Sequence, residues 1–230
     1  RTNVSEWIKE RFQEHPNVMR YLIGRMIYAD GIAALLTIGG VYVGGVLGWD
    51  TGQLAIYGII ASIFAVLGGF LGGFLDRVLG PKHALILELS MAILIGIFQI
   101  SITKDALLFG MIPAGHEGLS EGPFRTLADV AYVAAVIPAA IFLVAAISSS
   151  RYMLLHISPP EKIGEFFGFY AMSASVTVWL GPGAVALVTW LSGDQRIGST
   201  PVIVLLTLGL MILMTVKADK TPEHMKTGAE

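Results

Sequence analysis

Residues 68–82 read GGFLGGFLDRVLGPK, and this stretch decides the fold class. Two glycine pairs, Gly68 with Gly72 and Gly69 with Gly73, place small residues four apart, a spacing that lets helix backbones approach closely in lipid. The apolar run then stops at a charged turn that contains a Gly-Pro step. A helix packed this closely and ended this sharply is typical of a polytopic membrane protein.

The composition of the whole chain points the same way. Its 230 residues are 54% hydrophobic and 14% charged, whereas soluble domains carry about 25% charged residues. The mean hydropathy is +0.71, so we expect an integral membrane protein in contact with the lipid bilayer. The net charge of −2 argues against binding to nucleic acid, and the absence of cysteine excludes disulfides and thiolate metal sites.

Six apolar runs are long enough to cross a bilayer, which takes about 20 helical residues. They are residues 21–47, 54–75, 83–103, 130–150, 166–191 and 200–216. The sequence therefore predicts an all-α fold with a six-helix transmembrane bundle over residues 21–216.

The segments outside the bundle are short. Residues 1–20 contain Trp7, Ile8 and Phe12, which favour a short helix at the membrane interface, although a solvated linker fits equally. Residues 104–129 form the one long external loop, which we expect to be an irregular cap because it is rich in glycine and proline. Residues 217–230 form a polar tail.

Lysine and arginine residues are distributed unevenly between the two sides that six crossings create. Eleven lie in residues 1–20, in the second-to-third and fourth-to-fifth turns, and in the tail, whereas Lys104, Arg125 and Arg196 lie on the other side. Because cytoplasmic segments carry an excess of positive residues, we expect both termini in the cytoplasm.

Arg25 and Asp30 are ionisable residues inside the first span, where burial in hydrocarbon costs at least a few kcal/mol each. Asp30 lies about 13 Å along this span, near the bilayer midplane. The two side chains project roughly 140° apart, so we do not expect a direct pair. Asp30 could carry a proton, bind an amine or cap broken backbone at Gly31. Arg25 could snorkel or neutralise a carboxylate on another helix, and Tyr28 is a further candidate that packing also explains.

The fifth span carries a second polar surface. Tyr170, Ser173 and Thr177 recur at three- and four-residue spacing and share one helix face. Such a stripe either bonds to neighbouring helices or lines a water-filled pathway. The Gly181-Pro182 step in this span and Pro138 in the fourth predict kinks, which tend to lie beside cavities.

Charged residues gather where the spans end on the cytoplasmic side. Asp76 and Arg77 close the second span, Arg151 closes the fourth and Glu165 opens the fifth. Asp76 could approach Arg151 or the start of the fifth helix, whose positive dipole end favours a carboxylate. Topological charge and helix capping also explain part of this set. Glu88, inside the third span, has no evident partner and could snorkel or pair with a cytoplasmic arginine.

No pattern of catalytic residues occurs. The five histidines lack ligand spacing, and no glycine loop of the phosphate-binding type is present. We therefore expect neither an enzyme nor a cofactor.

Three stretches resemble a known family. Residues 72–85, GGFLDRVLGPKHAL, are similar to the turn between the second and third helix of each half of the major facilitator superfamily, with one extra residue between the Asp and the Gly. Residues 25–48, RMIYADGIAALLTIGGVYVGGVLG, and 159–183, PPEKIGEFFGFYAMSASVTVWLGPG, resemble the vacuolar amino-acid effluxer branch and its bacterial relatives. In those proteins both longer motifs occur in the second six-helix half.

The resemblance implies that this chain is the C-terminal half of a secondary transporter that moves a small polar solute, an amino acid as the family-level expectation, by alternating access. It implies a 3+3 inverted repeat of helices, which a short echo between residues 74–80 and 190–198 also suggests. The first, second, fourth and fifth helices would face the pathway, and the third and sixth would face lipid. Arg25, Tyr28, Asp30, Tyr170, Ser173 and Thr177 would lie on the substrate or proton pathway.

The resemblance also implies a cytoplasmic gate at Asp76, Arg77, Arg151 and Glu165, and a partner. The partner would be a second six-helix bundle, supplied by a missing N-terminal half, a separate chain or a second copy in a homodimer. The bacterial relatives imply a multi-pass protein of the bacterial inner (plasma) membrane. The alternative is a structural or assembly subunit of a larger membrane complex, built on the transporter scaffold without transporting.

Overall fold

A computed structural model describes residues 10, 12–114 and 122–218. The long helices are α2 (Pro16–Tyr42, continued by the π-helical turn Val43–Leu47), α3 (Thr51–Leu79), α4 (Pro81–Ser101), α5 (Leu127–Ile157) and α9 (Thr200–Met214). Shorter helices are α6 (Ile163–Val176), α7 (Leu180–Ser192) and α8 (Gln195–Gly198), and two-residue strands β1 (Ala106–Leu107) and β2 (Ile112–Pro113) form an antiparallel pair. The protein is an all-α, multi-pass membrane protein.

The six predicted spans correspond to five long apolar helices and one broken helix. Five helical segments of the described residues are long and apolar enough to cross a membrane, and α8 and α9 together make the last of them. The fifth span, 166–191, consists of two helices, because residues 177–179 separate α6 from α7. Pro182 lies in the first turn of α7, where its missing N–H is tolerated. The predicted kink is therefore a complete break one turn before the proline.

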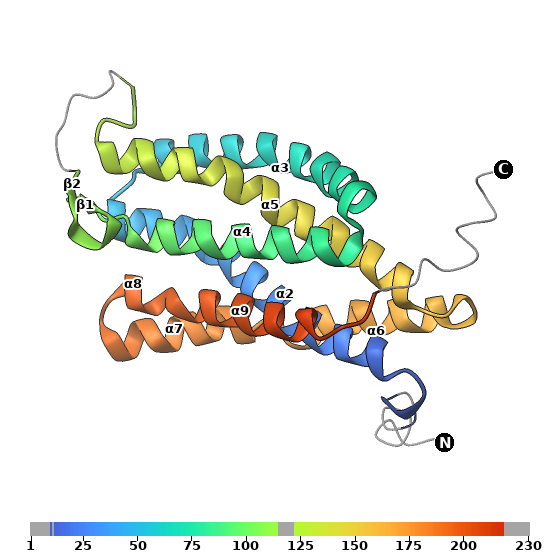
Figure 1. Ribbon diagram of the computed structural model, residues 1–230. Coiled ribbons are helices and arrows are strands. Elements are labelled where there is room, and N and C mark those ends of the chain that lie inside the picture. Colours follow the sequence, from blue (N-terminus) through green and yellow to red (C-terminus); the bar gives the residue numbers. More distant parts are fainter. Residues whose placement is uncertain (1–9, 11, 115–121, 219–230) are drawn as a thin grey trace.

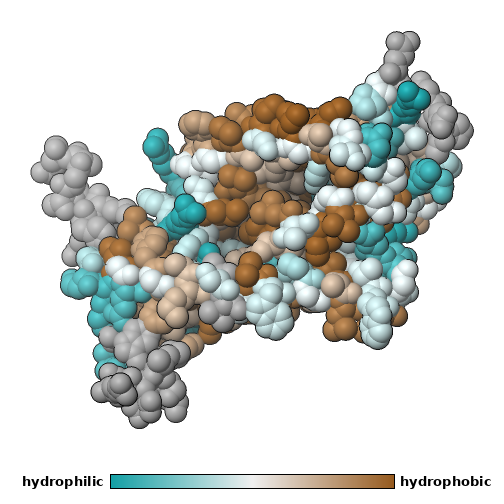
Figure 2. Space-filling view, turned by 180° about the vertical axis from the view of Figure 1, so that it is seen from behind, coloured by the Kyte–Doolittle hydropathy of each residue, from teal (hydrophilic) through white to brown (hydrophobic). Residues whose placement is uncertain are grey.

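The long helices run side by side, with the connecting turns at two ends (Figure 1). The α3–α4 turn, the α5–α6 turn, the start of α2 and the end of α9 all lie at one end, which we call the α3–α4 end. The loop between α4 and α5 lies at the other. In the view of Figure 1, α4 and α9 lie in front and α2 passes behind them. The reverse side has apolar side chains around a central hollow (Figure 2).

Only one of the two glycine pairs packs against another helix. A Cβ atom at Gly68 would lie 2.4 Å from the backbone oxygen of Ile141, and one at Gly72 would lie 3.0 Å from that of Ala145. Both glycines therefore hold α3 directly against the backbone of α5. A Cβ atom at Gly69 or Gly73 would meet nothing within 4 Å in the described residues, so this pair lies on the outer face of α3.

The turn after α3 depends on a glycine. Gly80 has φ +78°, a conformation that residues with a Cβ atom rarely adopt, and Pro81 begins α4 directly after it. This sharp reversal brings α4 back alongside α3 and α5. The predicted abrupt stop of the second span is thus confirmed.

Helix α9 fixes the position of α2 from the other side. A Cβ atom at Gly209 would lie 2.5 Å from Cβ of Tyr28, and one at Gly24 would lie 3.0 Å from Ile212. This close contact leaves the Tyr28 face of α2 no room to shift toward α9.

The loop between α4 and α5 is more ordered than the predicted irregular cap. It contains the β1–β2 pair, and its residues 115–121 lie outside the described part of the chain. Beside it, Trp49 Nε1 donates a hydrogen bond of 2.6 Å to Oδ1 of Asp129 and so links the end of α2 to the start of α5. The predicted interfacial positions Trp7 and Ile8 also lie outside the described residues.

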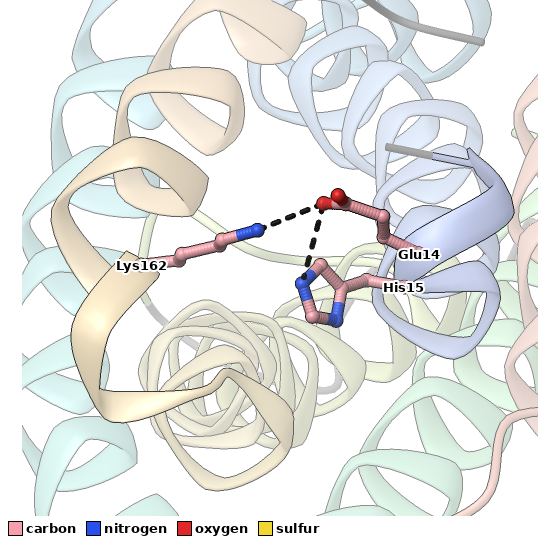
Figure 3. Close-up of polar contacts among 3 residues, drawn as sticks. All are labelled: Glu14, His15 and Lys162. Atoms are coloured by element: carbon pink, nitrogen blue, oxygen red, sulfur yellow. Dashed lines mark hydrogen bonds and ion pairs between the residues drawn. The ribbon is translucent and has the colours of Figure 1, made fainter. Parts of the chain in front are cut away.

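An ion pair ties the start of α2 to the α5–α6 turn. Lys162 Nζ lies 2.8 Å from Oε2 of Glu14, and His15 Nε2 lies 4.0 Å from the same oxygen (Figure 3). Both ends of the pair are partly exposed, so its contribution to stability is at most about 1 kcal/mol. The ion pair holds together two segments that are 148 residues apart in the chain.

Substitution of Gly68 by alanine is expected to lower the stability of the protein by about 1–3 kcal/mol, because the new methyl group would push α3 away from α5. Gly69→Ala is the matched control and should leave stability unchanged or slightly raised, since its methyl group enters open space. Unfolding in mixed micelles measures both. Equal effects of the two substitutions would contradict the assigned packing face.

Candidate functional site

Arg25 is the centre of the polar residues on α2. Its side chain is 8% exposed, and its Nη1 donates to the backbone oxygen of Tyr170 at 2.7 Å and to Oγ of Ser173 at 2.9 Å. The guanidinium carbon lies 3.7 Å from the centre of the Tyr170 ring, in cation–π geometry. Arg25 has no carboxylate partner among the described residues. The structure thus joins three of the predicted pathway residues, from α2 and α6, around one buried positive charge.

Three tyrosine hydroxyls surround Ser150 of α5. Ser150 Oγ lies 2.8 Å from Oη of Tyr28, 3.0 Å from Oη of Tyr21 and 3.2 Å from Oη of Tyr170. Tyr21 Oη also donates to the backbone oxygen of Ser150. Tyr21 and Tyr28 are seven residues apart on α2, two helical turns, and therefore share the face that carries Arg25. The cluster binds α2, α5 and α6 together.

A cavity of about 230 Å³ opens beside this cluster. Arg25, Tyr28, Ser150 and Tyr170 supply its polar lining, and its other walls are aliphatic side chains of α2 and α5 and Val178. It is smaller than the 300–1,000 Å³ that is usual for a complete ligand site. A second protein surface placed over it would complete a site for a small solute.

Asp30 does not line this cavity but lies close to it, at the break between α6 and α7. Thr177 Oγ1 donates to Oδ1 of Asp30 at 3.0 Å, and Asp30 is 4% exposed. A Cβ atom at Gly181 would lie 2.3 Å from the backbone oxygen of Asp30, so the first turn of α7 packs on α2 here. The positive dipole end of α7 and the Thr177 hydroxyl stabilise a carboxylate at this point. Among the described residues the Asp30 side chain bonds to the Thr177 hydroxyl, and no side chain caps the start of α7. The roles expected for Asp30 therefore stay predictions.

The four predicted gate residues all lie toward the α3–α4 end but do not form one network. Asp76 is 8% exposed, whereas Arg77 and Arg151 are exposed and Glu165 is partly buried in the first turn of α6. In the described part of the chain, Asp76 forms no ion pair with either arginine. Its neighbours are instead Ser149 and, close by, Glu88.

Two serines of functional interest escaped the sequence reasoning. Ser149 and Ser150 are consecutive in α5, between an apolar run and Arg151, and are completely or almost completely buried. The run of three serines at 148–150 could have indicated them. A serine hydroxyl inside a membrane span needs a hydrogen-bond partner, either in its own helix or on a neighbouring helix. Tyr21 was missed because it lies at the very start of the predicted first span.

No metal site is found within residues 10–114 and 122–218, since no three His, Cys, Asp or Glu side chains of the described residues gather in one place. The site is thus made of one cation, hydroxyl groups and a carboxyl group.

Comparison with known proteins gives a match over most of the chain. The family model described as "Vacuole effluxer Atg22 like" matches residues 5–226. An autophagy-related protein 22 from Cryptococcus neoformans is 22% identical over 221 residues, 93% of this chain and 39% of the relative. The MFS-type transporter YxiO from Bacillus subtilis is 21% identical over 219 residues, 93% of this chain and 44% of the relative. The chain spans about two fifths of the length of the curated relatives it matches.

Ser150→Ala is expected to destabilise the protein by about 1–2 kcal/mol, because three buried phenol hydroxyls lose their common partner. Ser62→Ala is a suitable control, since Ser62 bonds only to the carbonyl group of Gly58 in its own helix. Unfolding in mixed micelles compares the two. If Ser150→Ala were as mild as Ser62→Ala, the hydroxyl cluster would not hold the three helices together.

Proposed function

This chain belongs to the Atg22-like vacuole effluxer family, and we propose that it forms the second six-helix half of a secondary transporter. The transporter moves a small polar solute by alternating access, as the two halves rock around a site between them. The relatives, which include a transporter named as MFS-type, support this assignment. The chain acts without enzyme chemistry in this proposal.

The observation that carries the proposal is the buried charge of Arg25. An unpaired guanidinium in a membrane interior is costly and marks a functional site by default. The contacts described above use Nη1 alone, so in the described residues Nη2 and Nε have no hydrogen-bond partner. These nitrogens can bind a carboxylate in the two-pronged geometry that arginine favours. A solute with a carboxylate group would neutralise the charge.

We propose an amino acid as the solute, with its carboxylate on Arg25. The hydroxyls of Tyr28 and Ser150 lie on the same cavity wall and can orient the rest of the molecule. The sequence suggests Asp30 as a proton or amine site. In this proposal Asp30 serves as that site only in a state in which the α6–α7 break has opened. In the described arrangement its carboxyl group is buried and accepts a hydrogen bond from Thr177, and α7 packs on its backbone oxygen.

The hollow face of the bundle would be covered by a second six-helix unit. The cavity beside Arg25 is lined by residues of α2 and α5, by Tyr170 and by Val178, whereas no residue of α3 lines it. This lining supports the expectation that the first, fourth and fifth helices face the pathway, and for the second helix the expectation stays a prediction. The second unit would be another part of a longer polypeptide, a separate chain or a second copy. Exposed Arg77 and Arg151 could then pair with acidic groups of that unit and serve as the cytoplasmic gate with Asp76 and Glu165. We place the termini in the cytoplasm from the distribution of lysine and arginine. We propose a bacterial inner membrane because the relatives include a transporter of Bacillus subtilis.

Arg25→Lys, made in the complete transporter, is expected to weaken amino-acid transport at least tenfold. Lysine keeps the charge but loses the planar fork and the stacking on Tyr170. Arg20→Lys is the control, because Arg20 is exposed near the start of the same helix. This variant should transport at the wild-type rate. Uptake or efflux of labelled amino acids in proteoliposomes gives the rates.

Two outcomes would contradict the proposal. Wild-type activity in Arg25→Lys would remove the arginine from the substrate site. If the intact protein moved no amino acid and the hollow face were sealed by other subunits, the structural or assembly role would replace transport.

Asp30→Asn tests the second polar group. We expect loss of proton-coupled transport with little change in stability, since Asn can still accept the Thr177 hydroxyl. Thr177→Val should instead lower stability while leaving the carboxyl group available. Unchanged proton-coupled uptake or efflux in Asp30→Asn would leave Asp30 with its structural contact to Thr177 only.

A further inference from the structure

Two carboxyl groups from different helices meet at Ser149, away from the cavity beside Arg25. Glu88 of α4 and Ser149 of α5 are 0% exposed, and Asp76 of α3 is 8% exposed. Ser149 Oγ donates to Oε1 of Glu88 at 2.9 Å, and the carboxyl group of Asp76 neighbours the same hydroxyl. The two carboxyls are close enough to repel each other when both are ionised.

The packing of the helices explains why these residues meet. Gly72 lies against Ala145, so one helical turn further on Asp76 and Ser149 face each other. The turn at Gly80 returns α4 beside them, and Glu88 lies about 10 Å into α4. Its side chain leans toward the start of α4, as helical side chains do, and so reaches back to the level of Asp76.

Both carboxyl groups hold an oxygen that has no partner. Oδ1 of Asp76 and Oε2 of Glu88 are buried and accept no hydrogen bond from the described residues. Within the described residues, neither group forms an ion pair. At this end of α3, α4 and α5 the other titratable side chains are Arg77, Lys82, His83, Arg151, Tyr152 and His156. Helix α9, which also packs on α4, carries none.

Two adjacent carboxylates in a low-dielectric environment without a cation cannot both remain charged. A bound proton removes one of the two charges and so relieves the repulsion between the carboxyl groups. A divalent cation does not fit, because Ca²⁺ takes six to eight oxygen ligands and Mg²⁺ requires an octahedral set, whereas one serine and two carboxyls supply fewer.

We propose that Asp76 and Glu88 form a proton-binding site, in which one of the two carboxyl groups carries a proton and Ser149 holds Glu88 in place. Binding forms one O–H bond to a carboxylate, with the proton taken from water at the α3–α4 end, and releasing it reverses that step. The use of this proton to drive transport rests on the proposed function, but the binding itself does not.

Infrared spectroscopy of the purified full-length protein in lipid tests the binding directly. We expect the C=O stretching band of a protonated carboxyl group to persist at neutral pH and to disappear as the pH rises. In the double variant Asp76→Asn, Glu88→Gln this band should be lost. Asp50→Asn and Glu161→Gln, at exposed positions, are matched controls that should retain it.

Transport measurements then separate this site from the solute site. Glu88→Gln should still bind solute at the Arg25 site but lose the dependence of transport on a pH gradient, whereas Arg25→Lys should lose solute binding and keep the infrared band. If the protein moved no amino acid, the infrared band would still be expected. The two proposals can therefore fail separately.

The proposal is overturned if the difference spectrum between the wild type and the double variant contains no protonated-carboxyl band. It is also overturned if sodium ions displace the band at constant pH, since the site would then bind a cation. Circular dichroism and gel filtration show whether each variant is folded. If the double variant is unfolded, Ser149→Ala provides the second test, and it should shift the titration of the band without removing it.

Discussion

Gly68 and Gly72 allow α3 to lie directly against the backbone of α5, and the polar interior of the bundle is organised around this contact. In lipid no hydrophobic force draws helices together, so close backbone packing and interhelical hydrogen bonds must supply the association. The glycines bring Ser149 into reach of Asp76 one turn further along. Helix α9 makes an equivalent contact with α2 through Gly209.

Helix α5 then serves two polar sites with consecutive residues. Successive residues on a helix point about 100° apart, so Ser149 faces α3 and α4 while Ser150 faces α2 and α6. Each serine completes a set of groups that lipid could not solvate. The proposed solute site and the proposed proton site thus share a single turn of α5. A movement of this turn during alternating access would alter both sites together.

The sequence predicted the helices well and their partners poorly. Apolar runs of about 20 residues located the spans to within a few residues at most ends, because a bilayer imposes both the length and the composition of a crossing. The fifth span was the exception. Pro182 indicated a kink, but whether the helix bends or breaks depends on Asp30 and Thr177, which are 147 residues apart in the chain and bond across the gap. Similarly, burial of Asp76 beside Glu88 and Ser149 could not be read from a cluster of charges at helix ends.

By itself the sequence determined that this is a polytopic, helical membrane protein with an arginine and an aspartate within its first span that require an explanation. Hydropathy and charge are local properties, so a single chain reveals them. Only the tertiary structure decided that Arg25 faces a cavity without a carboxylate partner, that Gly68 and Gly72 pack while Gly69 and Gly73 face outward, and that Glu88 meets Asp76. These outcomes depend on which face of each helix meets its neighbour. That choice is made by contacts between helices far apart in sequence, and helical periodicity alone leaves it open.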